Sequence, residues 1–195
     1  FASETCALDI IGAKFLRDVE NGEIVYIEND ELKSIKPFPL KKPRPCVFEY
    51  IYFARPDSIL NGQCAYEYRK NFGKELAKET DTEADLIVPV PDSGNAAAIG
   101  YSQYTGKKFE LGLIRNHYVG RTFIEPVQKI RSLGVKLKLN ANKSSIKNKK
   151  IILVDDSLVR GTTSHKIVKM LYDAGAKEVH VRIASPEIKF PDFYG

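Results

Sequence analysis

The chain has 195 residues, of which 43% are hydrophobic and 28% are charged, the ordinary balance of a soluble globular protein with a well-buried core. No apolar run approaches the roughly 20 residues needed to span a bilayer, and the first residues lack the basic start and long apolar core of a signal peptide. The formal charge of +5 is compatible with nucleic acid, with a phosphorylated metabolite or with neither, so it excludes little.

Three cysteines, Cys6, Cys46 and Cys64, are scattered and show no CxxC spacing. This pattern indicates neither a disulfide framework nor a metal site, and a reducing cytoplasm fits it best. The chain begins without Met, in what looks like the middle of an element. We therefore expect a piece of a longer protein.

Residues 1–35 contain three short apolar runs, ALDII, EIVYI and ELKSI, separated by Asn-Gly and Asn-Asp pairs that favour turns. We expect these runs to be strands that include an antiparallel pair too small to fold alone. Residues 36–45 (KPFPLKKPRP) then hold four prolines in ten positions. Proline fixes φ and removes a ladder donor, so we expect an extended linker and a domain boundary here.

After the linker, strand-like and helix-like patterns alternate, which predicts an α/β fold with a parallel sheet covered by helices on both faces. The expected strands are Asp85–Val90, Phe109–Ile114, Lys150–Val154 and Glu178–Ser185. The expected helices are Gln63–Glu79, with Tyr66, Phe72 and Leu76 inward, residues 96–104, and Thr163–Ala174, with Ile167, Val168, Leu171 and Tyr172 inward. Gly175 is the expected cap of the last helix.

The segment Ile151–Ser164 (IILVDDSLVRGTTS) runs from an apolar strand through two acids into a Gly- and Thr-rich turn and a helix. Free N–H groups and the helix dipole make such a turn a place for phosphate. A nucleotide-binding P-loop would require GxxxxGK[ST], which is absent, and receiver domains carry their acidic pair at the end of the first strand. An acidic helix-capping turn without a ligand stays open.

The remaining interpretation explains why acids precede a phosphate loop. Strand, two acids and Gly/Thr loop together resemble the type I phosphoribosyltransferases, which bind phosphoribosyl pyrophosphate (PRPP). The resemblance implies that fold, with the loop on the 5′-phosphate and the acids on the ribose hydroxyls and Mg²⁺. Carboxylates near the ribose would stabilise the positive charge that develops during displacement at its anomeric carbon.

Longer strings narrow the resemblance to one family. VPVPDSGNAAAIGYS, NHYVGRTFIEP, KLKLNAN and DDSLVRGTTS are similar, in order and spacing, to glutamine phosphoribosylpyrophosphate amidotransferases, and so is SETCALDIIGAKFLRDVENGEIVYI near the start. The resemblance implies the end of a glutaminase domain over 1–35, a linker over 36–45 and a phosphoribosyltransferase domain over 46–195.

The resemblance also implies roles for single residues. The pyrophosphate turn would contain Asp92 and Ser93, and the metal would be held by Ser93, Asp155 and Asp156. The 5′-phosphate would be bound by Ser157, Arg160, Gly161, Thr162, Thr163 and Ser164. Residues 115–138 would form a lid over PRPP that carries Arg121 and Lys138. Between Lys129 and Lys150 there are eight basic residues and no acidic one, which suits a lid that closes on an anionic ligand. A solvated basic segment without a ligand would show the same composition.

The implied reaction transfers ammonia, taken from glutamine in the full-length enzyme, to PRPP. The family's catalytic amino-terminal Cys has no match here, so we expect no glutamine cleavage by this chain alone. Cys46 matches an iron–sulfur ligand of some members, but Asp192 stands where another Cys belongs, which argues against a cluster and for Cys46 as a buried thiol.

Expected partners are PRPP, purine nucleotides as feedback inhibitors and further copies of the chain, with neither nucleic acid nor membrane. The alternatives are a non-enzymatic PRPP-sensing regulator of the same fold and a salvage enzyme acting on a nucleobase. The sequence upstream of Phe1 would discriminate between them.

Overall fold

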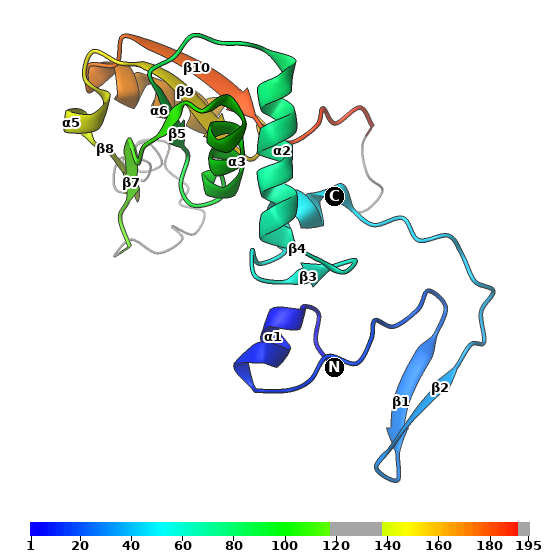
Figure 1. Ribbon diagram of the computed structural model, residues 1–195. Helices are drawn as coiled ribbons and strands as arrows, with labels where there is room; N and C mark the ends of the chain where they lie inside the picture. The colour runs from blue at the N-terminus through cyan, green and yellow to red at the C-terminus, as the bar shows by residue number, and fades with distance from the viewer. Residues whose placement is uncertain (118–137, 191–195) are drawn as a thin grey trace.

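The computed structural model describes residues 1–117 and 138–190 (Figure 1). A short helix and a hairpin form the amino-terminal part, and a larger body of sheet and helices follows the linker. The helices are α1 (Thr5–Ile10), the π-helical turn η1 (Glu49–Phe53), α2 (Ala65–Glu79), α3 (Asn95–Thr105), α5 (Lys143–Ile146) and α6 (Thr162–Asp173). The strands are β1 (Ile24–Glu28), β2 (Glu31–Ile35), β3 (Ile59–Leu60), β4 (Gln63–Cys64), β5 (Leu86–Pro89), β6 (Lys108–Phe109), β7 (Leu113–Arg115), β8 (Leu139–Ala141), β9 (Lys150–Asp155) and β10 (Glu178–Ile183).

The body is built on a sheet with the strand order β10-β9-β5-β6, in which every neighbouring pair is parallel. Parallel neighbours need a long crossover, and α3 and α6 supply crossovers after β5 and β9. The central strands β5 and β9 are almost wholly buried. The predicted α/β fold with a parallel sheet is therefore confirmed.

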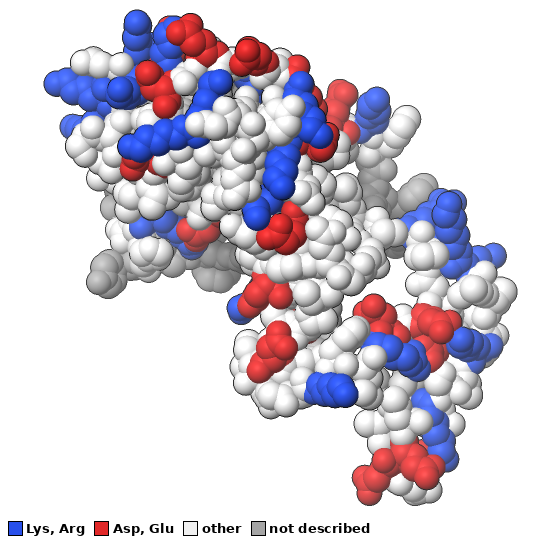
Figure 2. All heavy atoms as spheres, in the orientation of Figure 1, with Lys and Arg blue, Asp and Glu red and all other residues white. Residues whose placement is uncertain are grey.

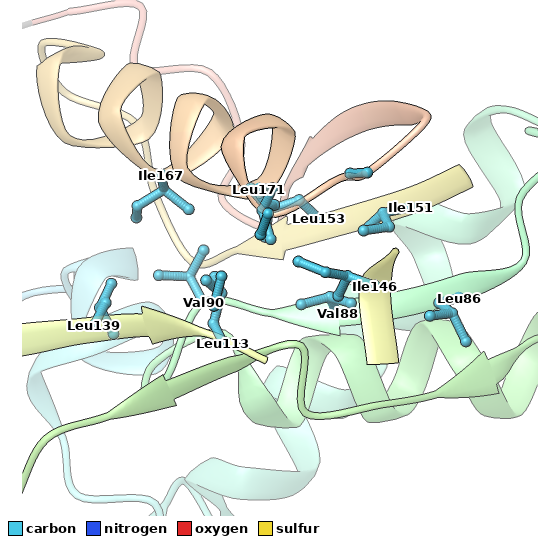
Figure 3. Close-up of a cluster of buried hydrophobic side chains, with 13 residues drawn as sticks. Leu86, Val88, Val90, Leu113, Leu139, Ile146, Ile151, Leu153, Ile167 and Leu171 are labelled. Atoms are coloured by element: carbon cyan, nitrogen blue, oxygen red, sulfur yellow. The ribbon is translucent and has the colours of Figure 1, made fainter. Parts of the chain in front are cut away.

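Both faces of this sheet are covered, because successive side chains of a strand point to opposite sides. One face carries the cluster of Figure 3, where side chains of the strands meet those of α6, including Leu86, Val88, Ile151, Leu153, Ile167 and Leu171. The other face packs against α2 and α3 through Ile87, Ile152, Val154, Leu76 and Tyr101. The predicted covering of both faces is confirmed.

Helices α2 and α3 cross in direct backbone contact. A Cβ added to Gly73 would lie 1.8 Å from the Ala97 carbonyl oxygen, and one added to Gly100 would lie 1.9 Å from that of Lys70. Only glycine fits at these two positions. The close crossing places the start of α3 beside the sheet edge where β5 ends.

The first apolar run was predicted wrongly. The first four residues of ALDII belong to helix α1, and Ile11 is its C-cap, so none of the run is a strand. A run this short has no period that separates the two states, and tertiary contacts decide its conformation. The hairpin β1–β2 is the antiparallel pair expected from the other two runs, and residues 36–45 contain no helix or strand.

Two further predictions about the body need correction. The single strand expected over Phe109–Ile114 is broken into β6 and β7, because the chain leaves the parallel sheet near Gly112 to pair antiparallel with β8. Tyr172 is 47% exposed, since it lies one position beyond the buried Leu171 and outside the inward stripe of α6. Tyr66 and Phe72 are half-buried, whereas Leu76 is buried as predicted.

Charged side chains of both signs are interspersed on the face drawn in Figure 2, over the body and along the hairpin. Elsewhere in the described residues, opposite charges form ion pairs, as in Lys150 with Glu83 and Lys78 with Glu75. The excess of basic residues therefore does not gather into a single basic surface on this face. Among the described residues, no helix is long and apolar enough to cross a membrane.

Candidate functional site

The site lies where the neighbouring strands β5 and β9 end. Beyond the last strand pair, the Val90 N–H donates to the Val154 carbonyl at 2.9 Å, and the chain then turns through Pro91–Gly94 into α3. A Cβ at Gly94 would lie 2.5 Å from the Val154 carbonyl oxygen, so glycine is required for this turn to pass the end of β9. Carboxyl ends of parallel strands are where ligands bind in open α/β sheets.

The turn and the acidic pair are directly bonded. The Ser93 hydroxyl donates to Asp156 Oδ1 at 2.9 Å, and the Ser157 hydroxyl donates to Asp156 Oδ2 at 2.8 Å. The structure thus brings together the predicted pyrophosphate turn, the predicted metal-binding acid and the first residue of the predicted phosphate loop.

Asp155 and Asp156 are 9% and 7% exposed, which is unusual for two adjacent acids. The Asp156 N–H donates to Asp155 Oδ1 at 2.9 Å. Burial, and then the neighbouring Asp156, raise the pKa of Asp155 to about 7. With carboxylate and hydroxyl oxygens converging here, the group has the hard oxygen donors that Mg²⁺ prefers.

The loop after the acids leads into α6. Gly161 precedes the helix in the left-handed region, at φ 70°, and its carbonyl accepts the first helical bond, from the His165 N–H at 2.9 Å. The amides that begin α6 therefore have no acceptor within the helix. Arg160, Thr162 and Thr163 are exposed there. This arrangement can receive an anion through N–H groups, hydroxyls and a guanidinium.

Two of the predicted residues, Asp92 and Lys138, contact β7 or the residue that follows it. Asp92 is exposed and forms an ion pair with Arg115, the last residue of β7. Lys138 lies beside the end of β7, where its carbonyl accepts the Asn116 N–H at 2.8 Å. Arg121, most of the expected lid over 115–138, and Asp192 lie outside the described residues.

The chain is similar to known proteins over its whole length. No family model matches the chain. It is 62% identical to an amidophosphoribosyltransferase of Rhizobium etli, over all of the chain and 40% of that protein. It is 54% identical to a chloroplastic amidophosphoribosyltransferase of Arabidopsis thaliana, over all of the chain and 34% of that protein.

A solved structure agrees with these relatives. The glutamine PRPP amidotransferase from B. subtilis, complexed with ADP and GMP, matches 99% of the chain with a TM-score of 0.88 and 53% identity. The chain is homologous to amidophosphoribosyltransferases over its whole length. It spans 40% of the R. etli relative and 42% of the B. subtilis chain. Its α/β fold is the phosphoribosyltransferase fold that the sequence predicted.

Arg69 was not predicted from the amidophosphoribosyltransferase motifs. In the structure it is a buried cation whose charge interacts with that of Asp156. Arg69 lies on α2, is 6% exposed and donates to the carbonyls of Tyr50, at 2.9 Å, and Ala54, at 2.7 Å. Burial lowers the pKa of Arg69, and the charge of Asp156 acts in the opposite direction. A signal was present, because Arg69 recurs with Ala65 and Gly73 at the four-residue spacing of the inward face.

The three cysteines of the chain have different surroundings. Cys46 is exposed, so the prediction of a buried thiol is wrong; it lies in the extended stretch just before η1, which belongs to no helix or strand. Cys6 is buried and Cys64 is half-buried, and all three are free thiols.

Proposed function

We propose that the chain is the phosphoribosyltransferase part of an amidophosphoribosyltransferase. The reaction transfers ammonia to PRPP and gives 5-phosphoribosylamine and pyrophosphate, the first step of de novo purine biosynthesis. Ammonia comes from glutamine in the longer enzyme. The contact between Ser93 and Asp156 supports the proposal best, because it joins the turn that would hold the pyrophosphate to an acid that would bind ribose and metal.

The proposal divides PRPP among three neighbouring groups. The loop before α6 would hold the 5′-phosphate through Ser157, Arg160, Gly161, Thr162, Thr163 and Ser164. The turn with Asp92 and Ser93 would hold the pyrophosphate. Asp155 and Asp156 would bind the ribose hydroxyls between them. This order suits a substrate that is a polyanion at both ends and a polyol in the middle.

The acids also suit the chemistry. Displacement at the anomeric carbon develops positive charge on the ribose, and fixed carboxylates stabilise that charge where it arises. Ser93, Asp155 and Asp156 are the residues that would hold Mg²⁺. When bound, Mg²⁺ neutralises the pyrophosphate leaving group. No covalent nucleophile is needed, because positioning the ammonia and the sugar supplies much of the rate.

The lid is part of the proposal. Arg121 and Lys138 would close over the pyrophosphate and exclude water, which would otherwise hydrolyse the activated sugar. The position of Lys138 beside the end of β7 supports this, since β7 also carries Arg115, the ion-pair partner of Asp92.

The proposal also covers feedback by nucleotides, cellular location, oligomeric state and domain boundaries. The B. subtilis relative is complexed with ADP and GMP, which supports purine nucleotides as feedback ligands here. We also propose a cytoplasmic homo-oligomer without an iron–sulfur cluster, with a glutaminase-domain end over 1–35, a linker over 36–45 and the transferase domain over 46–195. A PRPP-sensing regulator is not favoured, because the relatives are named as enzymes.

The test is binding of Mg²⁺ and PRPP by calorimetry, together with ammonia-dependent consumption of PRPP. The unaltered chain is compared with the double variant Asp155→Asn/Asp156→Asn and with Asp173→Asn, which removes an exposed acid from the far end of α6. We expect loss of binding only in the double variant. Equal binding by all three proteins would refute the site.

A further inference from the structure

The amino-terminal segment is hydrogen-bonded to the body through Glu4 and Thr5, which lie at the start of α1 next to β3 (Figure 1). Glu4 Oε2 accepts the Arg55 N–H at 2.8 Å and the Ser58 hydroxyl at 2.7 Å. Thr5 Oγ1 accepts the Ile59 N–H at 2.8 Å. We call these three hydrogen bonds the docking contacts. Because two side chains of the segment make them all, a substitution at either one removes a defined part of the attachment.

On the body, the docking contacts are linked to α2. Ser58 is fully buried, and its carbonyl accepts the Ala65 N–H at 2.8 Å. Because Ala65 is the first residue of α2, the residue that Glu4 holds also holds the start of this helix. Helix α2 crosses α3 in backbone contact, and α3 follows directly after the turn that contains Ser93. Helices in direct contact therefore connect the docked segment with the candidate site.

Apolar packing between the segment and the body is limited. Cys6 is the only buried residue of α1, and Ile10 and Ile11 at its end are each 74% exposed. A cavity of about 230 Å³ remains between the two parts, and its lining includes Leu8 of the segment and Leu60 of the body. Little apolar burial can therefore compensate for the loss of a docking contact.

We propose that Glu4 is a positioning residue for ammonia transfer, because it holds the amino-terminal segment in a fixed orientation on the transferase body. This inference rests on the proposed function, in which the segment is the end of the glutaminase domain. Hydrolysis of glutamine gives glutamate and ammonia in equal amounts. The ammonia nitrogen then bonds to the anomeric carbon, the bond from that carbon to pyrophosphate breaks, and the nitrogen releases a proton to solvent. With the segment fixed, the ammonia is released near PRPP instead of into the surrounding water.

The experiment uses the full-length enzyme and measures the glutamate formed from glutamine and the pyrophosphate formed from PRPP. Glu4→Ala removes the acceptor of the Arg55 and Ser58 donors. Because hydrogen bonds to a charged group are lost, we expect about tenfold less pyrophosphate per glutamate. With saturating ammonium in place of glutamine, the rate of pyrophosphate formation should stay unchanged, since no residue of the PRPP site is altered. The matched control is Asp9→Ala, which removes an exposed acid of the same helix and should change neither measurement.

Two milder variants separate positioning from a general defect in folding. Glu4→Gln keeps an acceptor oxygen without the charge, so it should lose less pyrophosphate per glutamate than Glu4→Ala. Thr5→Val keeps the shape of the side chain and removes the acceptor of the Ile59 N–H, so it should lower the same ratio. An unchanged ratio in Glu4→Ala, or an ammonium-dependent rate that falls in parallel with the glutamine-dependent rate, would overturn the inference.

Amide hydrogen exchange covers the case in which Glu4→Ala does not fold. Thr5→Val should speed exchange at the Ile59 amide about fivefold, because a neutral hydrogen bond is lost, and should lower the ratio of pyrophosphate to glutamate. Faster exchange with an unchanged ratio overturns the role in ammonia transfer. Absence of pyrophosphate with both glutamine and ammonium refutes the proposed function, whereas a normal ammonium-dependent rate with an unchanged ratio refutes only the role of the docking contacts.

Discussion

Ser93 and Asp156 lie 63 positions apart in the sequence, and the hydroxyl of the first donates to the carboxylate of the second at 2.9 Å. The contact crosses from the end of β5 to the end of β9. The contact links the turn to the acidic pair. A substitution at Ser93 therefore removes a hydrogen bond from Asp156, and a substitution at Asp156 removes the acceptor of the Ser93 hydroxyl.

Replacement of Ser93 tests this contact. Ser93→Ala removes a hydrogen bond to a charged group, so we expect about tenfold weaker binding of Mg²⁺ and PRPP in calorimetry. Ser144→Ala is the control, because the exposed Ser144 hydroxyl donates only locally, to Asn142 at 2.8 Å. Equal affinity for the two variants would show that the contact does not contribute to binding.

Asp155 makes stability depend on pH. Its pKa is raised to about 7 by burial, so between about pH 4 and pH 7 the folded chain binds a proton that the unfolded chain has released. Stability must therefore fall as the pH rises through this window and then level off. Asp155→Asn should remove the fall and gain on the order of 2–4 kcal/mol at pH 8. Urea unfolding at pH 5, 6, 7 and 8 checks this. A constant difference between the two proteins would contradict it.

The α2–α3 crossing predicts two severe substitutions. In Gly73→Ala and Gly100→Ala the new methyl group meets a backbone carbonyl that cannot move alone, so we expect a loss of about 3 kcal/mol each in the free energy of unfolding. Gly106→Ala is the comparison, because it has open space but a φ of 71°. It should cost about 1 kcal/mol from backbone strain. Similar losses at all three positions would mean that the crossing can relax.

The two faces of α6 should respond differently to truncation. Leu171→Ala removes a fully buried side chain near the end of α6 and should cost about 3 kcal/mol. Tyr172→Ala, at the neighbouring exposed position, should cost under about 0.5 kcal/mol. Thermal unfolding of both variants checks the difference, and a larger loss at Tyr172 would contradict the assignment of the inward stripe.

Much of this fold could be predicted from local sequence patterns. The β9–loop–α6 segment could be predicted because its strand, acids, glycine and helix are consecutive in the chain. The contact of Ser93 with Asp156 could not be derived from local patterns, since it depends on β5 and β9 being neighbours in the sheet. The helix α1 could not be predicted because contacts distant in the sequence decide it. The burial of Arg69 was missed although its spacing with Ala65 and Gly73 indicated the inward face of α2.

The neighbouring positions of β5 and β9 have a consequence for how the protein folds. Their pairing closes a long loop before it gains any contact, and such topologies fold slowly. During synthesis, β5, α3 and β6 leave the ribosome with one side of β5 unpaired. The candidate site therefore comes into existence only after β9 has been made and pairs with β5, and β10 then adds to the other side of β9. Until then the growing chain exposes the edge of an apolar strand, which is the stage at which it most needs protection from aggregation.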